Sequence, residues 1–344
     1  MAEATGIQIT PESLAQTFQT YREQLIVQPM LAMQDSLQHM SIKTGIRYRE
    51  TIGEMSGNFQ LGNYKKDKLG DGNVNIQGRV FETFFGNCVE PIDPNSIYQS
   101  IWGSNITKGE ALKNVPIVLA VCTYIMKKLG ENLALSLWSA KHVSTNFTET
   151  MAFFNGFKTI FDNDIAGTNE DGKIKISETL GNLETLNSDE SITKDNAEDV
   201  LKEFFFSRDK RLRSQNLKMF MSDLTYHAYT EAYQLNHGAL PYNQTYDKKT
   251  LEGASNVEIV SLPNVPDDFL CLTPQNNMFV LFNQKSDDET YTCEKSLKNH
   301  YDVDFIANQF FGTQVGSVSP QSFAILEKKA AAAPAPDPAP NPGT

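Results

Sequence analysis

The sequence predicts an α+β fold, in which helices and strands occupy different stretches of the chain. The clearest helical pattern lies in mid-chain, at residues 107–129, where apolar side chains recur every three or four positions. Runs with the two-residue period of strands lie within 45–81 and again after Thr250. At 344 residues the chain is long enough for one large domain or two ordinary ones.

The first forty residues are predicted to form a helical arm. Thr10 and Pro11 are a favourable N-cap and first-turn pair. Two apolar stripes follow at helical spacing: Leu14, Phe18, Tyr21 and Leu25, then Met30, Met33, Leu37 and Met40. A methionine stripe of this kind is typical of packing rather than of a ligand site. The arm therefore needs a surface to pack on, and that surface can belong to another chain.

Residues 45–81 predict a long β-hairpin. Two runs alternate between apolar and polar residues, with apolar positions at Ile46, Tyr48, Ile52, Val74, Ile76 and Val80. The glycine-rich connection between them contains Lys65, Lys66 and Lys68. At about 3.3 Å per residue, half of the segment extends close to 60 Å, whereas a compact chain of this length has a radius of gyration of about 20 Å. A lone hairpin is marginal in water, so we expect it to lie on a neighbouring copy; a surface loop is the alternative.

The mid-chain helix has identifiable start and stop signals. Thr107 and Glu110 have capping-box spacing, and Gly130 is a plausible stop. Lys127 and Lys128 suit the negative end of the helix dipole. Pro116 interrupts the pattern, so either one kinked helix or a turn followed by a helix from this proline fits. The preceding stretch, 81–102, is aromatic and rich in turn residues.

After the helix the chain enters a predicted second lobe. Two apolar stretches without a clear period come first, at 133–138 and 147–161. Residues 217–235 have helical period, ending at Gly238. From Thr250 onward the strand-like runs are VEIVSL, FLCLT, MFVLF, TYTCE, FIANQFFGTQV and SFAIL. The Ala/Pro-rich end, 327–344, is predicted to be disordered.

Between these parts lies a strongly acidic segment, 162–209. It contains thirteen Asp and Glu residues against five Lys and Arg, a net charge of −8. Such a charge run predicts a solvated face or an insertion. The basic residues Arg208, Lys210, Arg211 and Arg213 follow it and suggest a short surface for an acidic partner.

Composition excludes several classes of protein. The net charge of −12 argues against nucleic-acid binding by the whole chain. No apolar run reaches the roughly 18 residues of a membrane span, and the N-terminus lacks a signal-peptide pattern. The four cysteines, Cys88, Cys122, Cys271 and Cys293, are far apart and predict reduced thiols rather than a metal site.

The chain contains only incomplete matches to catalytic and metal-binding motifs. A loop starting at Gly167 places Asn169, Asp171, Ile174 and Glu178 at calcium-hand positions. Gly167 offers no carboxylate at the first position, so these four residues are weak calcium candidates and no metal site is assigned. The same loop fails as a phosphate loop, because Ile174 replaces the required hydroxyl. The five histidines form no HExxH pair, and GxSxG and GxGxxG are absent. The sequence therefore predicts no catalytic residues, no cofactor and no enzyme.

The order of these parts resembles the major capsid proteins of tailed phages, which have the Hong Kong 97 fold. Four pieces resemble capsid proteins of Bacteroides-group phages and prophages: LKMFMS, LEGASNVEIVSLPNVP, TPQNNMFVLF and DVDFIANQFFGTQV. The resemblance implies an N-terminal arm at 1–44, an E-loop at 45–81, a P-domain at 82–150 and 296–326 with its spine helix at about 107–129, and an A-domain at 151–295 with an acidic insertion at about 162–209.

The resemblance also implies a function and partners. The chain would self-assemble into hexamers and pentamers of an icosahedral shell around double-stranded phage DNA, which it would contact only weakly. Portal, scaffolding and decoration proteins would be its other partners, with no membrane involved. It would be assembled in the bacterial cytoplasm and located in the virion. Covalent cross-linking through the hairpin lysines is not predicted, since no matching motif is present.

Three alternatives stay open from the sequence. An encapsulin-type nanocompartment shell uses the same fold to store cargo enzymes. A calcium-binding protein or enzyme built on 162–209 is a hypothesis of another class. A tail or baseplate component is the third.

Overall fold

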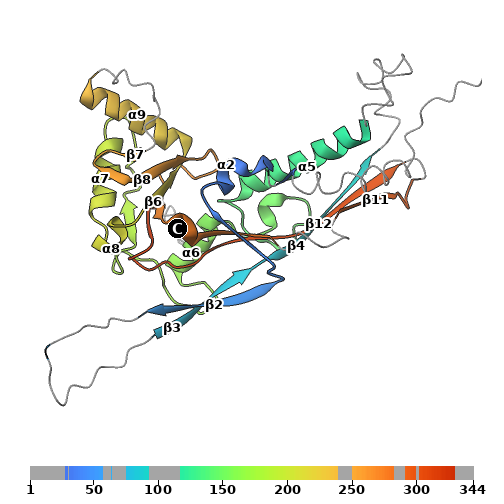
Figure 1. Cartoon of the computed structure of the whole chain (residues 1–344), viewed down its shortest axis with the longest axis horizontal. Coiled ribbons are helices and arrows are strands. Elements are labelled where there is room, and N and C mark those ends of the chain that lie inside the picture. Colours follow the sequence, from blue (N-terminus) through green and yellow to red (C-terminus); the bar gives the residue numbers. More distant parts are fainter. Residues whose placement is uncertain are drawn as a thin grey trace, which may run out of the picture. The chain divides into compact units, whose positions relative to one another are not determined.

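The computed structural model describes residues 28–29, 31–56, 63, 75–92, 117–238, 250–282, 291–299 and 302–329. Its contacts divide the chain into two compact units (Figure 1). The first unit comprises Met1–Ile174, Leu262–Asn264 and Pro274–Val318; the second comprises Lys175–Ser261, Val265–Thr273 and Ser319–Thr344. Each unit contains its own sheet and its own buried side chains.

A five-stranded sheet is the frame of the first unit. Its long strand β12 (Val303–Val315) pairs antiparallel with β4 (Phe84–Ile92) along one side. Along the other side β12 pairs with β11 (Tyr291–Lys295) and with β10 (Met278–Phe282), both antiparallel. The short strand β1 (Ser41–Thr44) joins β10 in parallel. The strands predicted from MFVLF, TYTCE and FIANQFFGTQV are thus confirmed.

Part of the helical segment of the first unit packs against β12 of this sheet. The first unit contains α5 (Ile117–Ser136), the short η2 (Thr150–Ala152) and α6 (Phe157–Ala166). The rings of Phe154 and Phe311 lie 4.6 Å apart between the loop before α6 and β12. The stretches 133–138 and 147–161, expected to open a second lobe, therefore belong to the first unit.

Helix α5 confirms the predicted mid-chain helix but runs past its expected end. Thr107, Glu110 and Pro116 lie outside the described residues, so the two alternatives for the helix start stay open. Gly130 was expected to stop the helix, yet α5 continues to Ser136. A Cβ at this glycine would lie 2.6 Å from the Cα of Pro29, so the glycine allows two backbones to approach closely rather than ending the helix.

The second half of the predicted arm packs within the first unit. Met33, Leu37 and Met40 are buried, and α2 (Gln34–Leu37) is one short turn of helix between them. The predicted packing role of the methionine stripe is confirmed for these positions. The first stripe, at Leu14 to Leu25, lies outside the described residues.

The predicted hairpin strands are present as a separate two-stranded sheet (Figure 1). Strand β2 (Arg49–Ser56) pairs antiparallel with β3 (Asn75–Glu82), in a register running from Arg49 opposite Glu82 to Ser56 opposite Asn75. Apart from Asn63, the connection 57–74 with its three lysines lies outside the described residues.

The second unit is built on a six-stranded sheet with the order β5-β13-β9-β6-β8-β7. The pairs β13–β5 and β6–β8 are parallel, and the other pairs are antiparallel. The described part of this unit also contains the helices α7 (Ala197–Phe206), α8 (Lys210–Arg213) and α9 (Asp223–His237). The strands, in sheet order, are Leu183–Leu186, Ala324–Lys328, Leu270–Thr273, Leu217–Met221, Ala254–Ser261 and Thr250–Leu251.

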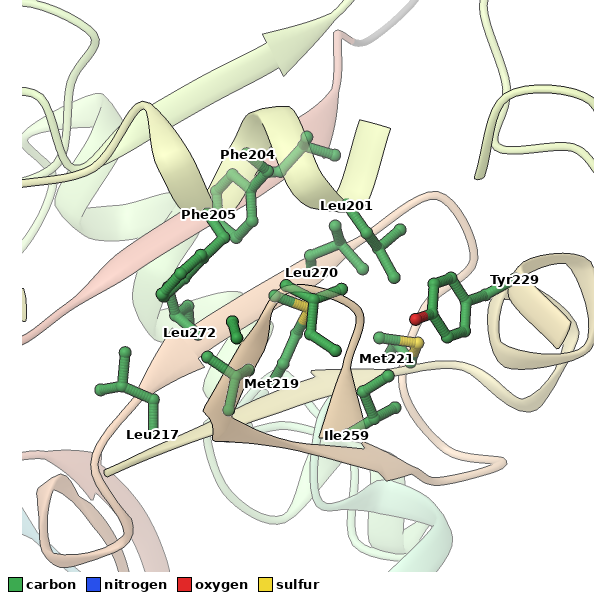
Figure 2. Close-up of a cluster of buried hydrophobic side chains, with 14 of the residues drawn as sticks. Leu201, Phe204, Phe205, Leu217, Met219, Met221, Tyr229, Ile259, Leu270 and Leu272 are labelled. Carbon is green, nitrogen blue, oxygen red and sulfur yellow. The ribbon is translucent and has the colours of Figure 1, made fainter. Parts of the chain in front are cut away.

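The core of the second unit lies between this sheet and α7 and α9 (Figure 2). Leu201 and Phe204 of α7 are fully buried there, together with Met219 of β6 and Tyr229 of α9. The acidic segment 162–209 therefore supplies core side chains and is not merely a solvated face. Its carboxylates do follow the prediction, because ten of the thirteen are exposed.

The helix predicted at 217–235 is two elements. Residues Leu217–Met221 form the central strand β6, and α9 begins at Asp223 with Ser222 as its N-cap, whose Oγ accepts a hydrogen bond from the Thr225 N–H at 3.2 Å. A strand buried on both faces is a continuous apolar run, which periodicity cannot distinguish from a buried helix. The predicted end at Gly238 is confirmed, with a φ of 76°.

The two units and the predicted domains divide the chain differently. Strands β10 and β11 fall inside the predicted A-domain, 151–295, but belong to the sheet of the first unit. Strand β13 continues to Lys328, two residues into the tail predicted to be disordered at 327–344. The domain assignment itself stays a prediction.

Candidate assembly surfaces

The loop after α6 contains the residues predicted as weak calcium ligands: Asn169, Asp171, Ile174 and Glu178. The Asn169 amide donates to Asp164 Oδ1 at 3.0 Å and to the Lys173 carbonyl at 2.7 Å. Glu178 accepts a hydrogen bond from the Thr185 hydroxyl. Among the described residues, no three His, Cys, Asp or Glu side chains are grouped so as to hold a metal ion. Asn169 and Glu178 thus bind parts of their own chain, and calcium binding stays a prediction.

The hairpin root, by which we mean residues 46–52 and 79–83, has an apolar side. Ile46, Phe81 and Leu281 form a small buried cluster, with Ile52 and Phe279 packed against it. The rings of Phe81 and Phe279 meet edge to face at 5.4 Å. Burial of these side chains holds the root of the hairpin against β10.

The hairpin root also has a buried polar side. The Arg79 guanidinium of β3 donates to Asp164 Oδ2 of α6 at 2.7 Å, with the two side chains only 7% and 3% exposed. The same guanidinium donates to Gln314 Oε1 of β12 at 3.2 and 3.3 Å. The Gln314 amide in turn donates to the Val80 carbonyl at 2.6 Å. One hairpin side chain therefore contacts two elements of the first unit.

Tyr48, the residue just before β2, has an unusual backbone conformation. Its φ is +66°, which is uncommon for a residue other than glycine. Thr83 holds it there: the Thr83 N–H donates to the Tyr48 carbonyl at 2.7 Å, and the Tyr48 N–H donates to Thr83 Oγ1 at 3.1 Å. Strained backbone conformations persist only where the surroundings determine them, and they concentrate at functional positions.

The side chain of Tyr48 lies on the face of the first sheet opposite the buried side chains of β12. Tyr48 is 63% exposed and Phe85 is 54% exposed, and both rings contact Phe310, with centroids 5.2 and 4.8 Å apart. The β4–β12 register places Val89, also exposed, opposite Ile306 on the same face. This set of residues is an exposed apolar surface, of the kind that marks protein interaction sites.

Sequence reasoning missed this surface because it treated 81–102 as turn-rich. Pro91 suggested that the stretch was not a strand, but it lies near the end of β4. Among the described residues β4 pairs with β12 alone, and proline is tolerated in a strand with one partner. The stretch FFGNCVEPI has no clear alternation between apolar and polar residues, so the sequence offered no strand signal there.

A second exposed apolar group lies on the loop between α5 and η2. Phe147 of this loop is 87% exposed. Val143 of the same loop and Met151 of η2 are also exposed. The loop is internally bonded: the Lys141 N–H donates to the Met151 carbonyl at 2.8 Å, and Asn146 Oδ1 accepts from the Thr148 N–H at 3.1 Å. Phe147 is thus held out on a hydrogen-bonded loop.

In the second unit, a buried carboxylate joins α7 to α9. Glu198 accepts hydrogen bonds from Lys202 at 2.6 Å, from Asn236 at 2.7 Å and from His237 at 2.9 Å. Burial acts to raise its pKa, but these hydrogen bonds outweigh burial and lower the pKa to about 2. Burial raises the pKa of the nearby Tyr229, and the Glu198 charge raises it further.

Arg208, predicted to belong to a basic surface, is instead buried. It pairs with Glu184 of β5 and donates to the Phe204 carbonyl at 3.0 Å and the Gly181 carbonyl at 3.1 Å. Burial lowers the pKa of this guanidinium, which its pairing with Glu184 opposes. The side chain therefore ties α7 to β5 and is not available to a partner.

Three solved structures with a similar fold are capsid chains. The capsid of a native GTA particle matches with a TM-score of 0.59 at 12% identity, covering 96% of this chain and 94% of that chain. The capsid asymmetric unit of cyanophage A-1(L) matches with a TM-score of 0.56 at 12% identity, over 87% of this chain and 92% of that chain. The capsid of an empty GTA particle gives a TM-score of 0.54 at 11% identity, over 85% and 95%.

This chain has the fold of phage capsid proteins. The likeness extends over most of each chain, so it includes both compact units and not one of them alone. No protein-family model matches the sequence, and no curated protein matches it either. Within the described residues, no helix combines the length and the apolar character needed to cross a membrane.

Proposed function

We propose that this chain is the shell protein of a phage capsid, which self-assembles into hexamers and pentamers around double-stranded DNA. The observation that carries the proposal is the match to the capsid of a native GTA particle, with a TM-score of 0.59 over 96% of this chain. Because the identity is 12%, this likeness is one of fold, and the function is inferred from it.

The exposed apolar surfaces support self-association. Tyr48, Phe85 and Val89 on the sheet face and Phe147 on its loop expose large apolar side chains to water. Burying apolar surface between copies contributes about 25 cal/mol per Å² before the costs of association. A shell protein repeats such contacts by symmetry, so contacts that are individually modest add up to a stable particle.

The finer assignments belong to the same proposal. Residues 1–44 would act as the N-terminal arm, 45–81 as the E-loop, 82–150 with 296–326 as the P-domain, and 151–295 as the A-domain. Portal, scaffolding and decoration proteins would be the other partners, and the virion the location. The link to Bacteroides-group phages rests on the four C-terminal sequence pieces alone.

The test is electron microscopy of the expressed full chain in negative stain, alone and with a scaffolding partner. Hollow polyhedra or capsomer rings are the expected result. A chain that stays monomeric at high concentration under both conditions would contradict the proposal. The contents of particles purified from infected cells separate the two shell functions: packaged DNA supports a capsid, whereas cargo enzymes without DNA support a nanocompartment.

A further inference from the structure

We propose that Arg79, Asp164 and Gln314 are positioning residues that fix the direction in which the β2–β3 hairpin extends from α6 and β12. The inference rests on the proposed function, because the partner of the hairpin would be a second copy of this chain. Two sets of contacts at the hairpin root would have different roles. The apolar cluster attaches the hairpin to β10, and the polar group of Arg79, Asp164 and Gln314 sets the angle of the hairpin.

The placement of Arg79 fits this role. It lies in β3 opposite Ile52 of β2, inside the paired part of the hairpin. Its guanidinium contacts Asp164 of α6 and Gln314 of β12, which lie on two different elements of the first unit. A planar guanidinium binds through several N–H groups in a fixed geometry. Two such contacts restrain rotation of the strand, which one contact does not.

Both partners of Arg79 are held in turn. Asp164 receives a second hydrogen bond from Asn169 at 3.0 Å. Gln314 Oε1 accepts from the Val315 N–H at 2.9 Å, and its amide donates to the Val80 carbonyl of the hairpin. Each of the three side chains therefore has at least two hydrogen-bond partners. Gln314 also binds Val80, the residue next to Arg79 in β3.

Stability alone does not account for a buried ion pair at this position. Removing a guanidinium and a carboxylate from water is costly, and apolar residues of similar size often stabilise a core as well or better. The hydrophobic effect is not directional, so the cluster of Ile46, Phe81 and Leu281 holds the root without fixing an angle. Hydrogen bonds with defined geometry supply the angle.

The length of the hairpin makes the angle matter. Each strand has eight residues, or about 25 Å at roughly 3.3 Å per residue. Four residues of each strand, or about 13 Å, extend beyond the root, so a tilt of about 10° moves their far end by about 2 Å, which is enough to break a hydrogen bond. A hairpin with a loose root would miss its contacts on a second copy.

The experiment compares the full chain with the variant Arg79→Met/Asp164→Leu. Spin labels are attached through bio-orthogonal amino acids at Gly53 of β2 and Lys173 beyond α6, so the native cysteines are kept. Labelled chain is diluted with unlabelled chain, and three quantities are measured: the thermal midpoint, the label-to-label distance distribution and the yield of closed particles. Arg79→Lys is the conservative variant, which keeps a charge for Asp164 but loses the fork on Gln314.

We expect the double variant to melt within a few degrees of the wild type, to show a clearly broader distance distribution and to give at least ten-fold fewer closed particles. Arg79→Lys should be intermediate in the last two quantities. The control is Glu82→Gln, which removes the ion pair of 2.8 Å between Arg49 and Glu82 within the hairpin and leaves the contact of Arg49 with Glu170 in place. It should leave the distance distribution and the particle yield unchanged.

The readouts separate the two proposals. An unchanged distance distribution in the double variant overturns the positioning role, and so does a broad distribution with normal particle yield. If the double variant loses its cooperative melt, Arg79→Lys decides: normal distances and particles then overturn the inference. Failure of the wild type to assemble contradicts the proposed function, whereas the distance measurement on the subunit still tests whether Arg79 fixes the hairpin.

Discussion

Glu198 illustrates, at the residue scale, how a charge is kept inside the second unit. It lies on α7 and binds Lys202 of the same helix and Asn236 and His237 at the end of α9. The carboxylate is nearly fully buried, and its partners replace the water that it loses. These hydrogen bonds join two helices that share the core in Figure 2. The charge of Glu198 therefore contributes to the stability of that core.

The pH dependence of unfolding follows from this residue. Folding lowers the Glu198 pKa from 4.5 to about 2, so its stabilisation is complete above pH 4.5 and is lost as the pH falls toward 2. The full effect is at most on the order of 3 kcal/mol. Glu198→Gln should lower the free energy of unfolding by about 1–3 kcal/mol at pH 7 and flatten its decline below pH 4.5. Denaturant unfolding at several pH values measures this.

The exposed neighbour Asp199 is the control for that prediction. Asp199→Asn removes a charge from the same helix without touching the network, so its pH profile should follow the wild type. Parallel profiles for Glu198→Gln and the wild type between pH 4.5 and 2 would contradict the assigned role.

Residue roles of this kind were only partly predictable. The sequence shows thirteen acidic residues in 162–209 without indicating which are buried. Glu198 and Asp164 differ from the others through partners that are far away in sequence, such as His237 and Arg79. Charge patterning describes the average residue of the segment, whereas burial is decided by tertiary contacts.

At the scale of elements, replacing Gly130 of α5 by alanine should destabilise the protein, whereas this substitution usually stabilises a helix. In an exposed helix interior, Gly→Ala is stabilising by about 1 kcal/mol. Here the added Cβ would meet the Cα and carbonyl oxygen of Pro29 at 2.6 Å, and backbone atoms cannot rotate away. Gly130→Ala should therefore lower the free energy of unfolding by about 1–3 kcal/mol, as measured by thermal or denaturant melts. Asn132→Ala on the exposed side of α5 should be neutral or stabilising; a stabilised Gly130→Ala would mean that the close contact is absent.

The hairpin offers a test of which part belongs to the subunit and which part serves assembly. Gly53 and Gly78 face each other in the β2–β3 register. Replacing residues 54–77 by a short Gly-Ser turn keeps Arg79, Phe81 and the apolar cluster of the root. The shortened chain should remain soluble with a cooperative melt, because the root contacts are retained, but should form no closed particles in negative stain. Loss of the cooperative melt would show that 54–77 is needed for folding.

Element types were predicted best where one face of an element is buried. The alternation around Ile52 and Val80 correctly gives the two hairpin strands, and the three-to-four spacing around Met126 gives α5. The failures are β6, which is apolar at nearly every position because both of its faces are buried, and β4, which contains Pro91 and has apolar residues on both faces. The exposed apolar surface around Phe310 was missed with β4, because the β4–β12 pairing brings Phe85 and Phe310 together.

At the scale of the whole molecule, two properties act against each other in self-association. Each copy has a net charge of −12, so copies repel one another. The exposed side chains that favour association are apolar, as at Phe85 and Phe147. Which of these dominates is set by the ionic strength, since salt screens the repulsion and leaves apolar burial largely intact.

Assembly should therefore be promoted by salt. Raising the ionic strength from 0.01 to 0.15 M shortens the Debye length from about 30 to about 8 Å, so the repulsion between copies of charge −12 weakens. The protein concentration at which particles appear should fall several-fold, as measured by light scattering and sedimentation. Asp189→Asn/Glu190→Gln, which removes two exposed charges, should shift the low-salt value in the same direction. Salt that dissolves the particles would instead show that ion pairs between copies, such as contacts of Lys65, Lys66 and Lys68 with acidic residues, outweigh the apolar surfaces.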